Sequence, residues 1–341
     1  MVDSQEGPAT HSNIPRVFVE KPADDEILSR LKEIASEAPT GLIADSDSWL
    51  RWIGQHRSIL ENSFSVVIHP TNDTLDKCLN KTGFLRWCAA NDVRSPKIYE
   101  PSELDGLDLS QRPVIVRPEV TQHGRAVDIP KAEEISDRSA LEDLLQSYDA
   151  LGLTPTITES LLRPDTRQYS VGVARNSRGE VRALVAEKLR PSARQCSTGT
   201  YVVASPDPEV AAQCIRIAHE LDLLGIAEIE MLQIDKRYLY AIEVNPRPWA
   251  QYALAWKSGF DFLTFVLDPD AYRQGEERRS GGRWLSFWED LYAVWSRSEG
   301  MLKGGEISIA AYVRSVLGSN VFPYWSISDL GPWVHQLQSR H

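Results

Sequence analysis

Two short segments late in the chain alternate between apolar and polar residues. Residues 226–234 and 238–244 both follow this period-two pattern, and a polar run at 235–237 separates them. Alternation of this length predicts two β-strands joined by a tight turn. Because the strands are neighbours, we expect Glu230 and Glu243 to lie side by side and to point into the same cavity.

Elsewhere, apolar residues recur three and four positions apart, which predicts amphipathic helices. This pattern occurs at 24–38, 47–61, 81–91, 137–151 and 208–223. Short apolar runs between the helices predict further strands at 40–44, 66–70, 114–117 and 156–160. Strands followed by a helix and more strands, as found from residue 168 onward, are typical of an antiparallel α+β sheet.

The order of these elements divides the chain into four segments. We expect a truncated α/β lobe at 1–76 and a linker helix with a small middle lobe at 77–160. An antiparallel-sheet lobe follows at 161–268, and a helical, tryptophan-rich tail occupies 269–341. The predicted fold class is therefore mixed α+β and α/β.

Composition narrows the function classes. The chain has 341 residues, 42% of them apolar and 25% charged, as in ordinary globular proteins. Its formal net charge of −11 argues against nucleic acid or an anionic membrane as a partner, because these require a basic face. The four cysteines show no metal or disulfide spacing. No apolar run would span a membrane and no signal peptide is evident, so we expect a cytoplasmic protein.

Glu230, Glu243 and Asn245 form a candidate metal site. Two carboxylates on neighbouring strands repel each other unless a cation lies between them. Mg²⁺ prefers oxygen ligands, usually one or two carboxylates completed by substrate phosphates and water. Asn245 lies two residues beyond Glu243 on the same strand face and adds a neutral oxygen. The alternative is an ordinary hairpin with a solvated acidic face.

These residues also match a known family. The segment 242–247, Ile-Glu-Val-Asn-Pro-Arg, resembles the metal strand of the ATP-grasp superfamily, which includes biotin carboxylase, carbamoyl phosphate synthetase and D-alanine–D-alanine ligase. Segments 80–96, 114–118 and 157–162 are similar to the family's linker helix, phosphate-binding strand and interdomain hinge. The tail from 282 to 333 is similar to that of the carboxylate–amine ligase branch, which contains D-aspartate ligase.

The resemblance covers residues 41–333 and implies an ATP-grasp fold of three lobes followed by the helical tail. In that fold the N-terminal lobe is nucleotide-fold-like, and here its first strand is shortened to 17–19. The resemblance also implies ATP and Mg²⁺ as cofactors, with Mn²⁺ as a substitute for magnesium.

The resemblance assigns the phosphate contacts as well. Lys81 and Arg117 take the places of two lysines that contact the α- and β-phosphates, so Arg117 departs from the family pattern. Arginine still clamps phosphate, and bidentately, although with another geometry. In the loop that replaces the glycine-rich phosphate flap, Gly124 would offer a backbone N–H and His123 would touch the γ-phosphate. The alternative for Lys81 is a surface lysine at the start of a helix, and the alternative for His123 and Gly124 is that they are ordinary loop residues.

The hinge strand supplies the expected adenine contacts. Glu159, Leu161 and Leu162 would border the ring, whose donor and acceptor edges a strand backbone can satisfy. Gln168 matches a position where the family often has an acidic residue for the ribose hydroxyls.

Lys188, Arg190 and Arg247 are the residues that the resemblance marks as catalytic. Lys188 and Arg190 would face the γ-phosphate or an acyl phosphate, and their alternative is a solvated strand face. Arg247 would bind the transferring phosphoryl group or the carboxylate of the acceptor. No general base is evident for an incoming amine.

The expected reaction is ATP-dependent amide formation. A carboxylate would attack the γ-phosphate to give an acyl phosphate and ADP, and an amine would then displace phosphate. Small-molecule carboxylates and amines, amino acids foremost, are the expected partners. Three alternatives stay open: a carboxylase, a small-molecule kinase and an inactive nucleotide-binding regulator. The tryptophan-rich tail is either a homodimer contact or a helical cover over the core.

Overall fold

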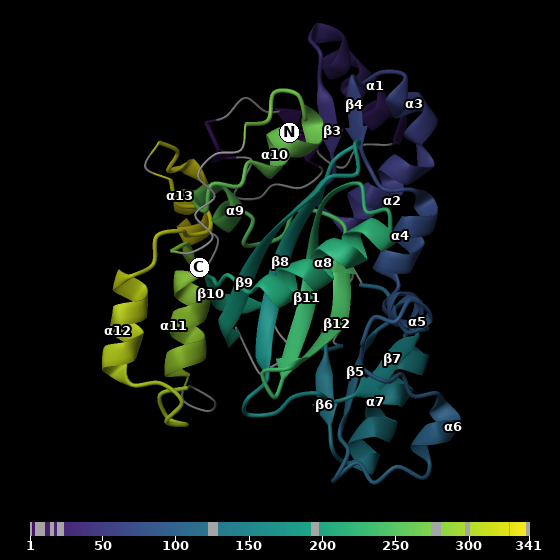
Figure 1. The fold of residues 1–341 in the computed structure, drawn as a ribbon, viewed down its shortest axis with the longest axis vertical. Helices are drawn as coiled ribbons and strands as arrows, with labels where there is room; N and C mark the ends of the chain where they lie inside the picture. Colours follow the sequence, from purple (N-terminus) through teal and green to yellow (C-terminus); the bar gives the residue numbers. More distant parts are fainter. Residues whose placement is uncertain are drawn as a thin grey trace.

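A six-stranded antiparallel sheet lies at the centre of the molecule, with strand order β12-β11-β8-β9-β10-β13 (Figure 1). The computed structural model describes residues 2–3, 11–13, 17–18, 24–121, 129–191, 198–273, 281–296, 301–326 and 328–338. The strands span Arg167–Arg175 (β8), Val181–Pro191 (β9), Gly199–Ala204 (β10), Gly225–Ile234 (β11), Tyr238–Asn245 (β12) and Arg283–Leu285 (β13). The predicted hairpin is confirmed as β11 and β12, and Glu230 is the direct cross-strand partner of Glu243.

Helices cover both faces of this sheet. One face packs against α4 (Asn72–Leu79), α5 (Lys81–Ala90) and α8 (Pro208–Glu220), the other against α9 (Ala253–Lys257) and α10 (Phe262–Leu267). On the second face, Ile226 of β11 belongs to the apolar core. Glu228 and Glu230 follow Ile226 at period two and therefore share its face. Along this face the side chains change from apolar to acidic.

The N-terminal lobe contains short parallel strand pairs. It comprises β1 (Val2–Asp3) with β2 (Val17–Phe18), β3 (Gly41–Ile43) with β4 (Val66–Ile68), and the helices α1 (Asp24–Glu37), α2 (Asp47–Gln55) and α3 (Arg57–Glu61). The single helix expected at 47–61 is wrong, because the backbone leaves helical geometry at His56, where ψ is 13°. At this position the His56 Nδ1 atom lies 2.9 Å from the carbonyl oxygen of Trp52.

The middle lobe is built on a three-stranded antiparallel sheet of order β6-β5-β7. Its elements are α6 (Pro101–Leu104), β5 (Val114–Pro118), β6 (Glu133–Ile135), α7 (Arg138–Ala150) and β7 (Pro155–Glu159). Val116, Leu141 and Tyr148 are buried in a core of its own. The lobe therefore packs around a different centre from the large sheet.

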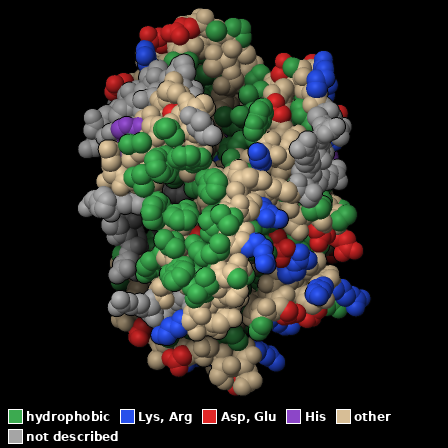
Figure 2. Space-filling view, turned by 90° about the vertical axis from the view of Figure 1, so that its left-hand side faces the viewer, with side chains coloured by type: hydrophobic (Ala, Val, Ile, Leu, Met, Phe, Trp, Pro, Cys, Tyr) green, Lys and Arg blue, Asp and Glu red, His purple; other side chains and the backbone are tan. Residues whose placement is uncertain are grey.

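The tail contains α11 (Phe287–Trp295), α12 (Ile309–Leu317) and α13 (Gly331–Gln338). On α12, Ile309, Val313 and Leu317 follow one another at a spacing of four and are 59%, 47% and 81% exposed. On α11, Tyr292 and Trp295 are also exposed. Figure 2 looks at the side where α11 and α12 lie in Figure 1 and shows hydrophobic side chains gathered over it. The tail thus presents an apolar face to solvent.

The mixed fold class is confirmed, since parallel strand pairs, an antiparallel six-stranded sheet and covering helices occur in one chain. Among the residues described, none of the helices combines the length and the apolar character that crossing a bilayer would require.

Candidate active site

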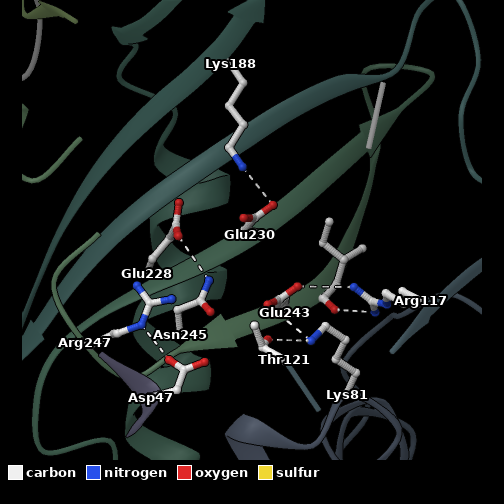
Figure 3. Close-up of polar contacts among 11 residues, drawn as sticks. Asp47, Lys81, Arg117, Thr121, Lys188, Glu228, Glu230, Glu243, Asn245 and Arg247 are labelled. Carbon is white, nitrogen blue, oxygen red and sulfur yellow. Dashed lines mark hydrogen bonds and ion pairs between the residues drawn. The ribbon is translucent and has the colours of Figure 1, made fainter. Parts of the chain in front are cut away.

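The acidic positions of β11 and β12 form the centre of the candidate site (Figure 3). Glu230 lies opposite Glu243, and Glu228 lies opposite Asn245. The Asn245 side-chain nitrogen donates to Glu228 Oε2 at 3.1 Å, and Ser170 Oγ donates to the other oxygen of Glu228. With its nitrogen engaged, the Asn245 amide has its oxygen left to contact a cation.

Two cations reach Glu243 from outside the large sheet. Lys81, at the start of α5, places Nζ 3.9 Å from Glu243 Oε1 and donates to Thr121 Oγ1 at 3.1 Å. Arg117, on β5, places Nη1 3.4 Å from Glu243 Oε2 and donates through Nη2 to the Ile242 carbonyl at 2.9 Å. Both cations are buried, and burial lowers the pKa of the Lys81 ammonium despite the nearby carboxylate.

Lys188 of β9 pairs with Glu230, and 2.8 Å separates Nζ from Oε2. Burial alone would lower the pKa of Lys188, but the charges of Glu230 and Glu228 outweigh it and hold that pKa above its ordinary value. Burial alone would raise the pKa of Glu230, but Lys188 outweighs it and keeps that pKa low. Burial and the charge of Glu230 raise the pKa of Glu228. Lys188 and Glu230 are therefore a charged pair, and Glu228 holds a proton more readily than an ordinary glutamate.

A cavity of about 770 Å³, partly open to solvent, lies against this cluster. Its charged lining consists of Lys81, Arg117, Lys131, Glu159, Glu230 and Glu243. Its apolar lining includes Leu161, Leu162, Leu232 and Ile242, and Gln168 also contacts it. The four residues expected around adenine and ribose thus share one cavity with the expected phosphate and metal residues. Apolar walls with a few convergent charged groups are typical of a cofactor site.

The Nε atom of Arg117 indicates how an anion would fit. It is buried and has no hydrogen-bond partner among the described residues. Buried donors are normally satisfied, so an acceptor that enters the cavity, such as a phosphate oxygen, suits this position.

The acidic residues fit a divalent ion that arrives with phosphates. Within the described ranges, no three or more His, Cys, Asp or Glu side chains are grouped as a metal site. Mg²⁺ needs no such group, because phosphates and water complete its shell around one or two carboxylates. Glu230 and Glu243, with the oxygen of Asn245, supply that partial set. These three residues would therefore hold magnesium.

Arg247 connects the large sheet to the N-terminal lobe. Its Nε donates to Oδ1 of Asp47, the first residue of α2, at 2.6 Å. Trp249 anchors the segment that follows, and its indole lies over Gly172 of β8. A Cβ at position 172 would lie 1.9 Å from Trp249 Cη2, so only glycine leaves room for the ring. In Figure 3, Arg247 lies on the Asn245 side of the site.

Arg190 does not join this cluster, and the role expected for it is corrected. Its Nε and Nη2 donate to the two carboxylate oxygens of Asp290 in α11 at 2.7 and 2.8 Å. The guanidinium lies 4.1 Å from the centre of the Tyr201 ring. Lys188 pairs with Val202 and Arg190 with Tyr201, so two steps on β9 match one on β10. This bulge turns Arg190 to the opposite face from Lys188, toward the tail.

Two expected phosphate contacts, His123 and Gly124, lie outside the described residues. The sequence reasoning missed Glu228, Lys131 and Asp47. Glu228 shares the alternation that identified Glu230, so its position on the same face could have been found. Asp47 lies 200 residues from Arg247, and no local pattern reveals that contact.

Comparison with known proteins supports the fold. No protein-family model and no curated protein match the sequence. Among solved structures, biotin carboxylase from Campylobacter jejuni is 16% identical with a TM-score of 0.61, over 78% of this chain and 64% of that one. L-amino acid ligase from Bacillus licheniformis is 17% identical with a TM-score of 0.56, over 73% and 61%.

N5-carboxyaminoimidazole synthetase from Staphylococcus aureus, complexed with ADP, is 12% identical with a TM-score of 0.60, over 80% of this chain and 71% of that one. The chain spans less than two thirds of the biotin carboxylase and of the amino acid ligase, and 26% of a pyruvate carboxylase from Rhizobium etli. At these identities the likeness concerns the fold. Three lobes around an antiparallel sheet, together with these structural neighbours, show that the chain has the ATP-grasp fold.

Proposed function

We propose that this protein is an ATP- and magnesium-dependent ligase that joins a carboxylate to an amine through an acyl phosphate. The proposal is based on the ion pairs that Lys81, Arg117 and Lys188 form with two opposed carboxylates beside a partly apolar cavity. The two carboxylates are Glu230 and Glu243. Cations placed around a phosphoryl group, with a divalent ion, are what phosphoryl transfer requires.

In this proposal the nucleotide occupies the cavity with its base against Leu161 and Leu162 and its ribose near Gln168. Lys81 and Arg117 bind the α- and β-phosphates from the middle-lobe side. Magnesium, when bound, neutralises phosphate charge that these side chains leave uncompensated. Support comes from the neighbours, because the biotin carboxylase structure is a β,γ-ATP complex and the synthetase structure is a complex with ADP.

The chemistry has two steps. An oxygen of the substrate carboxylate attacks the γ-phosphorus in line, the bond to the bridging oxygen of ADP breaks, and an acyl phosphate forms. Lys188 would stabilise the transferring phosphoryl group and Arg247 would orient the carboxylate. A neutral amine then attacks the acyl carbon and releases phosphate, so the products are an amide, ADP and phosphate.

Carboxylation of a small molecule, with bicarbonate as the source of the carboxyl group, is a second candidate, because biotin carboxylase and N5-carboxyaminoimidazole synthetase are among the structural neighbours. Both reactions would use the same residues for the first step. They differ in whether bicarbonate or an organic carboxylate accepts the phosphoryl group.

The test measures ADP release from ATP and Mg²⁺ with panels of amino acids, hydroxy acids and bicarbonate, followed by mass spectrometry of the products. Glu243→Gln should abolish ADP release while the circular dichroism spectrum stays unchanged. Glu142→Gln, at an exposed position on α7, is the matched control and should retain full activity. Wild-type turnover in Glu243→Gln would refute the metal assignment, and a phosphorylated end product without amide would refute the ligase.

A further inference from the structure

The cavity beside the acidic strands contains a third cation, Lys131, in addition to Lys81 and Arg117. Lys131 belongs to the middle lobe and lies two residues before the first residue of β6. It is exposed to solvent. Among the residues that the structure describes, no hydrogen bond or ion pair engages its ammonium group.

The other two cations of the lining are already paired. Lys81 and Arg117 are both buried, and both contact Glu243, at 3.9 and 3.4 Å. A triphosphate that binds these two cations must therefore compete with a carboxylate. Lys131 can bind an anion without giving up any partner in the described part of the chain.

The pairing of β5 with β6 brings Lys131 close to Arg117. Val116 of β5 lies opposite Glu133 of β6 at the end of their ladder. Arg117 and Ala132 come next along the two segments, and both line the cavity. Lys131 is the neighbour of Ala132. The side chains of Arg117 and Lys131 thus enter the cavity from adjoining ends of one strand pair.

The charge of Lys131 acts on the end of the cavity where the phosphates are expected. Burial is the main cause of the low pKa of Lys81, and the charges of Arg117 and Lys131 add to it. Burial alone would raise the pKa of Glu230, but Lys188 outweighs burial, and Lys131 acts in the same direction as Lys188. Lys131 is therefore near both the lysine expected at the inner phosphates and the carboxylate expected at the metal ion.

We propose that Lys131 binds the outer phosphates of the nucleotide and thereby makes the site selective for ATP over nucleotides that lack them. This inference rests on the proposed function, because it takes the nucleotide to lie in this cavity. MgATP carries a net charge of about −2, so an unpaired cation at the cavity also attracts it. Such a local attraction matters in a chain whose formal net charge is −11.

The test measures the dissociation constants of MgATP and AMP for the full chain, MgATP by calorimetry and AMP by competition with MgATP. AMP keeps the nucleoside and one phosphate but has no outer phosphates. Lys131→Gln should weaken MgATP binding about tenfold, a modest loss for a hydrogen bond to a charged group because the side chain is exposed. AMP binding should change by less than about twofold. Lys131→Arg should restore most of the MgATP affinity, since it returns the charge.

Lys257→Gln is the matched control. Lys257 is the last residue of α9, is exposed and does not line the cavity, so the same change of net charge there should leave MgATP binding unchanged. The difference between Lys131→Gln and the wild type should also shrink as salt is added, because exposed charges are screened.

The possible outcomes separate this inference from the proposed function. MgATP binding that is unaffected by Lys131→Gln, weakened equally with that of AMP, or weakened equally by Lys257→Gln would refute the role of Lys131 and leave the nucleotide site intact. A wild-type chain that binds no MgATP would refute the nucleotide site itself. Selective loss of MgATP binding in Lys131→Gln, with no amide formed by the wild type, would support Lys131 and refute the ligase.

Discussion

Replacing Arg190 with methionine should destabilise the fold rather than remove a catalytic group. Arg190 is 4% exposed and Asp290 is 0% exposed, and the two form a bidentate ion pair between β9 and α11. Thr200 Oγ1 also donates to Asp290 at 2.8 Å, so the carboxylate would keep one neutral partner. Methionine fills much of the same volume but leaves the carboxylate without a positive charge.

The expected cost follows from that uncompensated charge. Breaking a buried ion pair from one side costs about 3–5 kcal/mol of unfolding free energy. With a urea dependence of about 3 kcal/mol per molar, the midpoint of unfolding should fall by about 1–1.7 M. Urea titration followed by circular dichroism and tryptophan fluorescence measures this shift.

A double substitution separates charge from packing. Arg190→Met combined with Asp290→Leu removes both charges, and buried pairs replaced by apolar residues are often neutral or stabilising. The double variant should therefore regain most of the stability that the single variant loses. An Arg190→Met chain with wild-type stability but no ADP release would refute this reasoning and return Arg190 to the catalytic group.

Further expectations concern the nucleotide site, the thiols and the tail. Lysine in Arg117→Lys cannot keep the contacts of Arg117 to both Glu243 and the Ile242 carbonyl, so the KM for ATP should rise about tenfold. An unchanged KM, measured by steady-state ADP release, would argue against a role for the guanidinium group. Burial raises the pKa of the Cys88 thiol to about 12, so below that pH the thiol stays protonated. Iodoacetamide at pH 8 should therefore modify Cys88 about 1000-fold more slowly in the native chain than in the urea-unfolded chain, as measured by peptide mass spectrometry. Equal rates would contradict its burial. The exposed apolar residues Ile309, Val313 and Leu317 of α12 predict a homodimer. Light scattering should therefore report a dimer for the wild type and a monomer for Val313→Lys. A wild type that is monomeric at concentrations of tens of micromolar would indicate that α11 and α12 only cover the core.

Local patterns predicted the parts of the site that a single hairpin contains. The alternation identified both strands and their acidic residues, but the exact pairing also needs a register shift between Glu230 and Met231. A regular ladder from the turn would have placed Glu230 opposite Ile242 instead of Glu243. The same alternation failed for Arg190, because one bulged residue on β9 reverses the face of everything after it. A bulge depends on the partner strand, so the sequence of β9 alone does not reveal it.

Contacts between lobes were also beyond local reasoning. Asp47 meets Arg247 only because α2 and the end of β12 are brought together by three-dimensional packing. The break at His56 lies inside a run with continuous helical spacing of apolar residues, so the pattern does not reveal it. The hollow beside the tail likewise combines residues from β13, α11, α13 and the segment after β12, each of which alone is an ordinary apolar position.

The pairing of Glu243 with Lys81 and Arg117 has a consequence for discrimination among anions. Those two cations are already balanced by a carboxylate of the large sheet, so a lone phosphate or sulfate that displaced it would leave the partly buried Glu243 without these counterions. A nucleotide that carries its own divalent ion gives the displaced carboxylate a new positive partner in the same event. The site would therefore bind free phosphate or sulfate weakly, and it would bind the triphosphate together with its metal ion.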